Sequence, residues 1–317
     1  MSRFSAVMQR RMFRLLVVAG FSMLAVFVWW MQVQPDPVAD AGDEIRVAAT
    51  IFPLYDVARV VGAGEIDVQL IVPPGASPHT FTFTPQGVRA IQGSQVIFAV
   101  GQGLDTWIAD VQSSIPGSRV VTVDRNVQLR HMGEDSEHED EHGHGEYDPH
   151  YYLSLVQMQE VTRTIAATFK ELKPESSALF EARATAYVAE LQALHRETAD
   201  TLAPLKGASI ITLHDAWGYY AHEYDLHITG TFEPAAGEEP TPQYLSRLRA
   251  AIRLDGVKVL FGEPQLSGAA LESFARDTNV TIAQLDPEGG LPGRETYLAQ
   301  MRYNAQALDR ALAPYVR

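Results

Sequence analysis

Short apolar runs alternate with longer amphipathic stretches along the chain from residue 45 onward. Four runs in the first half are rich in β-branched residues and bounded by Gly, Pro or Asp: IRVAATI (45–51), VQLIV (68–72), QVIFAV (95–100) and RVVTVD (119–124). Continuous apolar runs of this kind are typical of parallel strands that are buried on both faces. Because helical patterns fill the intervening stretches, the first half predicts an α/β lobe with a four-stranded parallel sheet.

The second half repeats this order of strands and helices. Its apolar runs are ASIITL (208–213), LHITG (226–230), VKVLFG (257–262) and VTIAQL (280–285). A Thr-Pro-Gln triplet opens a helical stretch in each half, at Thr84 and at Thr241. Threonine as N-cap with proline at the first helical position is a start signal for a helix. The equivalent places of the two triplets favour a duplicated lobe.

A long stretch without glycine separates the two halves. After Pro174, residues 175–205 carry apolar positions at helical spacing for about eight turns. This length exceeds that of an ordinary crossover helix and predicts a rigid connection. We therefore expect an α/β protein of two lobes, each a parallel four-stranded sheet flanked by helices, joined by one long rigid helix. The N-terminal lobe spans 42–173, the linker helix 174–205 and the C-terminal lobe 206–317.

The first 41 residues have the pattern of an export signal. Four arginines precede an apolar run at 15–31, and a small-x-small triplet follows at 39–41. This order predicts a signal peptide at 1–41 that is cleaved near Ala41. Retention as a membrane tether is the alternative, because the apolar run is just long enough to anchor a chain. Either outcome predicts export to the periplasm, and the absence of cysteine argues against a lipid-attached form.

Composition narrows the class of function further. The 317 residues are 46% hydrophobic and 20% charged, which is enough apolar material for the cores of two domains. The formal net charge is -14 at pH 7, and the sequence after the signal contains no cluster of Lys and Arg. Because phosphate binding requires such clusters, we expect no nucleic acid partner.

Four potential metal ligands follow predicted strands, two in each half. In chain order these residues are His79, His150, His214 and Asp286. Open α/β sheets bind ligands at the carboxyl ends of their strands. Taken singly, each residue is better explained as a turn or core residue, but their joint placement indicates one site. Three imidazoles and one carboxylate form a ligand set that suits Zn²⁺, whereas Mn²⁺ prefers more oxygen ligands.

The stretches around these residues also resemble a known family. They are IVPPGASPHTFTFTPQGVRAIQGSQVIFAVGQGLDTWI (71–108), YDPHYYLSL (147–155), ITLHDAWGYYAHEYDL (211–226), GEEPTPQYLSRLRAAIRLDGVKVLFGEPQ (237–265) and VTIAQLDP (280–287). In this order they resemble the zinc/manganese substrate-binding proteins of bacterial ABC importers, whose lobes are joined by one long helix. The resemblance places the three histidines and Asp286 on the family's metal-ligand positions. Members that prefer manganese typically have Glu at the third position, so His214 implies zinc.

The resemblance implies a function as well as a site. Such a protein captures Zn²⁺ between its lobes in the periplasm and delivers it to the membrane permease of a zinc ABC importer. We expect it to act as a monomer and not as an enzyme. A zinc-dependent hydrolase is the main alternative, but it needs an open coordination position and a general base, and the sequence has no HExxH motif. A metal-binding surface adhesin of the same fold is the third interpretation, and the missing lipid-attachment cysteine counts against it.

A tract rich in histidine and acidic residues precedes His150. Residues 131–147 read HMGEDSEHEDEHGHGEY, a composition that cannot form a core by itself. We expect a mobile loop beside the site that gathers zinc weakly, since neutral imidazoles bind metal. Its histidines are His131, His138, His142 and His144. An inert solvated loop is the alternative. Glu263, close to a predicted strand end, is interpreted as a residue that supports the site without binding metal.

Overall fold

The computed structural model describes residues 45–132, 146–266 and 269–316 of the chain. The predicted signal peptide at 1–41 and most of the histidine-rich tract lie outside these residues. Within the described ranges, no helix combines the length and the apolar character that a membrane crossing requires.

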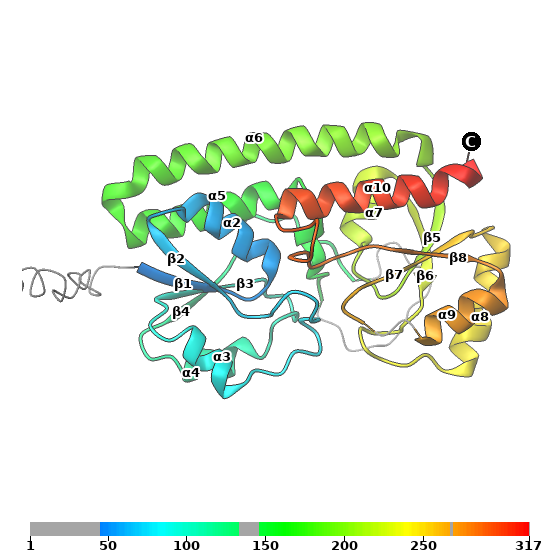
Figure 1. The fold of residues 1–317 in the computed structure, drawn as a ribbon, viewed down its shortest axis with the longest axis horizontal. Coiled ribbons are helices and arrows are strands. Elements are labelled where there is room, and N and C mark those ends of the chain that lie inside the picture. The colour runs from blue at the N-terminus through cyan, green and yellow to red at the C-terminus, as the bar shows by residue number, and fades with distance from the viewer. Residues whose placement is uncertain (1–44, 133–145, 267–268, 317) are drawn as a thin grey trace, which may run out of the picture. The chain divides into compact units, whose positions relative to one another are not determined.

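Two parallel sheets form the centres of the two lobes (Figure 1). The first has the strand order β2-β1-β3-β4, with β1 (Ile45–Ala49), β2 (Ile66–Leu70), β3 (Val96–Ala99) and β4 (Arg119–Thr122). The second has the order β6-β5-β7-β8, with β5 (Ser209–Thr212), β6 (His227–Thr231), β7 (Val259–Gly262) and β8 (Thr281–Gln284). The eight predicted strands are confirmed, and the equivalent strand orders support the duplication of the lobe.

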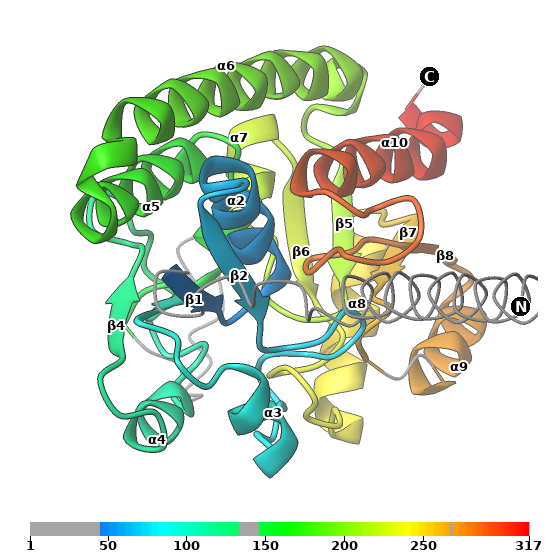
Figure 2. The same ribbon diagram turned by 60° about the vertical axis from the view of Figure 1, so that its left-hand side comes forward.

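Helices cover both faces of each sheet (Figures 1 and 2). In the first lobe the pair α2 (Phe52–Gly62) and α5 (Gln157–Leu172) faces the pair α3 (Pro85–Ala90) and α4 (Ile108–Ser113) across the sheet. In the second lobe α8 (Pro242–Leu254) and α9 (Ala269–Thr278) pack on one face, and α7 (Gly218–Tyr224) and α10 (Tyr297–Val316) pack on the other. Helices therefore cover both faces of each sheet, as the continuous apolar runs predicted, while the edge strands β4 and β8 stay partly exposed.

The two Thr-Pro-Gln triplets begin helices as predicted. The Thr84 hydroxyl accepts a hydrogen bond from Gly87 N at 3.2 Å at the start of α3. The Thr241 hydroxyl accepts one from Tyr244 N, also at 3.2 Å, at the start of α8. Each cap satisfies a backbone N–H that has no partner within its helix.

The linker is helix α6 (Ser177–Leu202), whose 26 residues span about 39 Å. Single 3-10 turns, η2 (Pro174–Ser176) and η3 (Ala203–Leu205), flank it and complete the predicted stretch 174–205. Helix α6 runs beside α5 and α10 (Figure 1). Because α10 packs against α6 and also against α2 of the first lobe, the lobes are joined by more than the single helix that the sequence predicted.

One apolar core extends through both lobes. It contains residues of the first sheet and of α2, of α6, and of the second sheet and α10; among them are Val47, Leu54, Phe98, Leu191, Ile210, Val259 and Met301. The first sheet separates this core from a smaller one under α4, as the alternate residues of β1 show. Val47 and Ala49 face the shared core, and Ala48 faces the smaller core. Separating the lobes would expose this shared core, so the fold favours a stiff arrangement of the two lobes.

Candidate metal centre

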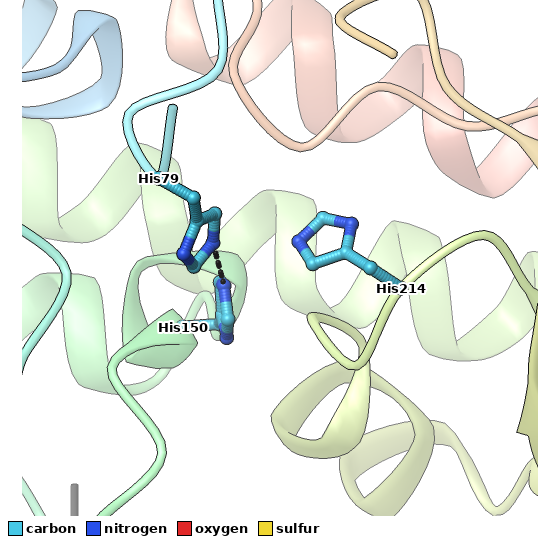
Figure 3. A group of neighbouring side chains, drawn as sticks. All are labelled: His79, His150 and His214. Atoms are coloured by element: carbon cyan, nitrogen blue, oxygen red, sulfur yellow. Dashed lines mark hydrogen bonds between the residues drawn. The ribbon is translucent and has the colours of Figure 1, made fainter. Parts of the chain in front are cut away.

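Three histidines from separate parts of the chain meet between the two lobes (Figure 3). His79 lies in the loop that follows β2, His150 begins the 3-10 turn η1 (His150–Leu153), and His214 follows β5. One nitrogen of each ring lies within 4.8 Å of the other two. In the part of the chain that the structure describes, this trio is the one group of three or more metal-binding side chains.

The spacing of the rings suits a tetrahedral zinc ion. His79 Nε2 and His150 Nε2 are 3.1 Å apart. Two imidazole nitrogens that each lie about 2.0–2.1 Å from zinc in a tetrahedral site are about 3.4 Å from each other. The His79–His150 pair therefore already has nearly the separation that the ion requires, and His214 closes the third side with ring centroids 5.2 and 5.4 Å away. His150 and His214 are 2% and 5% exposed.

Asp148 fixes the orientation of His150. Its Oδ1 accepts a hydrogen bond from the backbone N of His150 at 2.8 Å and lies 2.8 Å from His150 Nδ1. A proton held on Nδ1 leaves the lone pair of Nε2 for a metal ion. Gly218 allows α7 to approach, since a Cβ there would lie 3.1 Å from Asp148 Oδ2. The sequence analysis did not identify Asp148, although its position two residues before His150 was a usable signal.

Glu263 forms a close ion pair with His214. Glu263 Oε2 lies 2.8 Å from His214 Nδ1, and Glu263 Oε1 accepts a hydrogen bond from Trp217 Nε1 at 3.2 Å. Burial acts to lower the pKa of His214, but the charge of Glu263, helped by Asp215 and Glu233, raises it on balance. The carboxylate thus holds Nδ1 and leaves Nε2 for metal, which agrees with the supporting role predicted for Glu263.

Aromatic residues hold the loop of His79 in place. Trp107 Nε1 donates a hydrogen bond to the carbonyl of Pro78 at 3.2 Å. Its ring packs against Phe81 and Phe83, with centroids 5.1 and 6.1 Å away. The loop of His79 is therefore anchored to the smaller core of the first lobe, whereas His214 is anchored in the second lobe.

Asp286, the fourth predicted ligand, does not join the imidazole cluster. Its side chain is fully buried, and Oδ1 accepts hydrogen bonds from Gln265 Nε2 at 2.6 Å, Glu288 N at 3.1 Å and Gly289 N at 3.0 Å. Oδ2 lies 3.0 Å from Arg294 Nη1. These contacts all come from the second lobe, and among the described residues the structure brings together three of the four predicted ones.

Glu288 supplies a contact between the lobes that the sequence did not reveal. Its Oε1 accepts a hydrogen bond from the Tyr152 hydroxyl at 2.9 Å. Burial raises the pKa of Glu288 to about 8. Since Tyr152 lies in the same 3-10 turn as His150, this bond ties the second lobe to the segment that carries a ligand.

The other histidines that the structure describes do not join the trio. His131 pairs with Tyr147 in an isolated bridge, with ring centroids 4.7 Å apart. The predicted auxiliary residues His138, His142 and His144 lie outside the described residues. His195, on α6, contacts the Tyr224 hydroxyl at 3.1 Å.

The fold and the site define a class: a two-lobed α/β protein with three converging imidazoles that suit a transition metal. The chain belongs to the family described as "Zinc-uptake complex component A periplasmic", which matches residues 47–311. The predicted resemblance to metal substrate-binding proteins is thereby confirmed.

Named relatives cover most of the chain. The zinc-binding protein AdcA of Streptococcus pyogenes is 26% identical over 315 residues, which is 92% of this chain and 60% of AdcA. This chain thus spans about 60% of the length of that relative. The high-affinity zinc uptake system protein ZnuA of Bacillus subtilis is 27% identical over 282 residues, covering 86% of this chain and 88% of that protein.

Solved structures share the fold. A crystal structure of ZnuA has a TM-score of 0.74 and 24% identity, covering 85% of this chain and 99% of its own. The laminin-binding protein of Streptococcus agalactiae, described as having adhesin and metal transporting activity, has a TM-score of 0.74 and 22% identity, covering 84% of this chain and 99% of its own. At these identities the likeness establishes the fold alone.

Proposed function

We propose that this protein binds one Zn²⁺ between its lobes and delivers it to the permease of an ABC importer. The convergence of His79, His150 and His214 carries this proposal. Each imidazole comes from a different segment, and two of them are oriented by buried carboxylates. Such carboxylates fix the ring and raise the basicity of the nitrogen that faces the metal.

Zinc fits this ligand set better than manganese does. Imidazole nitrogen suits Zn²⁺, whereas Mn²⁺ is best served by carboxylate, carbonyl and water oxygens. The order of intrinsic affinities also places Zn²⁺ well above Mn²⁺ for the same ligands. We propose zinc as the transported ligand and expect the protein to retain it against excess manganese.

Asp286 is proposed as a fourth ligand that reaches the ion only when it leaves Arg294. Its Oδ2 makes no hydrogen bond among the described residues, so it is the atom that a metal ion could take. Because water can replace it in the coordination shell, Asp286→Ala should cost less zinc affinity than the loss of any of the three histidines.

The proposed setting is the periplasm, with the protein exported by the signal at 1–41 and acting as a monomer. The family description and the uptake role named for the Bacillus subtilis relative support this setting and the permease as partner. The family is a solute-binding component, which supports a transport role without catalysis. We further propose that His131, His138, His142 and His144 bind zinc weakly beside the main site.

Zinc titration of single variants tests the proposed site. Loss of a residue that hydrogen-bonds a metal ligand weakens metal binding by about 10- to 100-fold. Because His214 is itself a proposed ligand, His214→Ala should weaken zinc binding by more than this. Circular dichroism should show an intact fold. His227→Ala is the matched control, because this histidine is exposed and contacts Asp255 at 3.5 Å instead of the cluster. If His214→Ala binds zinc as tightly as the unmutated protein, the proposed site is wrong.

A further inference from the structure

The first turn of α7 reaches from the second lobe to the segment that carries His150. The hydroxyl of Tyr219 accepts a hydrogen bond from Arg130 N at 2.8 Å and donates one to the carbonyl of Asp148 at 3.3 Å. The backbones of Arg130 and Asp148 are also paired, since Asp148 N donates to Arg130 O at 2.9 Å. Tyr219 is 3% exposed, and the Arg130 guanidinium lies over its ring at 5.9 Å. One phenol of the second lobe thus fixes two peptide groups of the first lobe.

Asp148 connects this contact to a proposed zinc ligand. Its Oδ1 accepts a hydrogen bond from His150 N and lies 2.8 Å from His150 Nδ1. Gly218, the residue before Tyr219, lies close to the other oxygen of the same carboxylate, because a Cβ at this position would be 3.1 Å from Asp148 Oδ2. The second lobe therefore holds Asp148 by its carbonyl and packs closely against its carboxylate.

The same turn of α7 is tied to the ligand of the second lobe. Trp217, the N-cap residue of α7, donates a hydrogen bond from Nε1 to Glu263 Oε1 at 3.2 Å. Glu263 Oε2 lies 2.8 Å from His214 Nδ1. Residues 217–219 thus contact two carboxylates that each lie beside a ligand imidazole, one in each lobe. A displacement of this turn would move the partner of one imidazole relative to the partner of the other.

We propose that Tyr219 is a positioning residue for zinc binding. Its hydroxyl holds Asp148 in place against the second lobe, and Asp148 holds the ring of His150 in the orientation that offers Nε2 to the ion. This inference rests on the proposed function. Without the hydroxyl, the Arg130 amide and the Asp148 carbonyl lose a hydrogen-bond partner, which costs free energy and loosens this segment. The loss should appear in zinc binding, because the carboxylate partner of an imidazole ligand fixes the direction of its lone pair.

Zinc affinities of two neighbouring tyrosine variants test the proposal. Tyr219→Phe removes the hydroxyl and keeps the buried ring. Its zinc affinity in competition titration should fall by about 2- to 30-fold, the usual size of an effect that reaches a site through intervening residues. Tyr220→Phe is the matched control, because Tyr220 is the next residue of α7, is 1% exposed and makes no hydrogen bond from its hydroxyl among the described residues. Tyr220→Phe should bind zinc as tightly as the unmutated protein.

Two further measurements show whether Tyr219 acts through Asp148. In an Asp148→Asn background, Tyr219→Phe should cost less zinc affinity than it does alone, since the effects of residues in contact are not additive. The Nδ1 proton of His150, followed by NMR, should exchange with solvent faster in zinc-loaded Tyr219→Phe than in zinc-loaded Tyr220→Phe. The reason is that the carboxylate that accepts this proton is held less firmly, so local opening is more frequent.

Equal zinc affinities of Tyr219→Phe and Tyr220→Phe overturn the proposal, as does an equal cost of Tyr219→Phe with and without the Asp148 carboxylate. A lower urea midpoint of Tyr219→Phe with unchanged zinc affinity would show a purely structural role and overturn it as well. If Tyr219→Phe does not fold, Gly218→Ala decides, because its Cβ presses on the Asp148 carboxylate. Its zinc affinity should also fall, and an unchanged affinity would refute the positioning of Asp148 by α7. Failure of the site itself would appear separately, as tight zinc binding by His214→Ala.

Discussion

Replacing Glu223 with glutamine should stabilise the protein in mild alkali and leave its stability in acid unchanged. Glu223 lies in α7, and its side chain is 13% exposed. Its carboxylate accepts a hydrogen bond from the Ser154 hydroxyl, which belongs to the first lobe, and Oε2 lies 3.8 Å from His195 Nδ1 on α6. Burial raises the pKa of Glu223 from 4.5 to about 7, because hydrogen bonds to the charged form only partly offset the lost solvation.

The sign and size of the effect follow from this pKa. Between pH 4.5 and about 7 the folded protein holds a proton on Glu223 that the unfolded chain has released. The stability that this group contributes is therefore present in acid and is lost as the pH rises through the folded-state pKa. A rise from 4.5 to about 7, at about 1.4 kcal/mol for each pH unit, corresponds to a loss of about 3 kcal/mol.

Urea unfolding of the metal-free proteins at about pH 5 and about pH 8 measures this loss. Glutamine resembles the protonated acid and does not ionise. The unfolding free energy of the unmutated protein should thus fall by about 2.5 kcal/mol more than that of Glu223→Gln between these two pH values, since pH 5 already lies above the unfolded-state pKa. Glu190→Gln, an exposed change on α6, should follow the unmutated protein. Titrating groups that do not contact Glu223 cancel in the comparison, so parallel pH profiles for the unmutated protein and Glu223→Gln would refute the reasoning.

Three further predictions concern the site and its frame. Asp148→Asn should weaken zinc binding about 10- to 100-fold in isothermal titration, because the imidazole of His150 loses its carboxylate partner. An unchanged zinc affinity would contradict the role of Asp148 in orienting His150. Gly290→Ala should lower the urea midpoint more than Gly64→Ala. Both glycines have φ of +74°, but only at Gly290 would a Cβ meet another residue, 2.8 Å from Pro74. Equal decreases in the urea midpoint would show that the contact with Pro74 is unimportant. Replacing residues 133–145 by a short glycine linker should keep one tight zinc site and remove weaker ones, and identical isotherms would favour an inert loop.

The hydrophobic pattern was sufficient to predict the fold because most strands are continuous apolar runs. The strands from β1 to β8 and the stretch around α6 appear where periodicity placed them. The role of α10 was not predicted, because its amphipathic pattern is that of any terminal helix. Its contact with α2, in the other lobe, depends on tertiary packing that local sequence does not encode.

The sequence predicted the candidate site only in part, because it indicates which residues follow strands but does not show how their side chains are oriented. The rule that ligands gather at strand ends placed His79, His150 and His214 near one another, although a long tract separates His150 from its strand. The same rule could not show which way the carboxylate of Asp286 points. Its direction depends on Arg294, eight residues further along a loop with no periodic pattern.

The central claim is that one zinc ion is bound by three imidazoles between the lobes. A crystal of the zinc-loaded protein, measured on both sides of the zinc absorption edge, tests it most directly. The account predicts one strong anomalous peak about 2.0–2.1 Å from a ring nitrogen of each of His79, His150 and His214. A strongest peak at any other place in the molecule, or one that touches fewer than three of these rings, would contradict it.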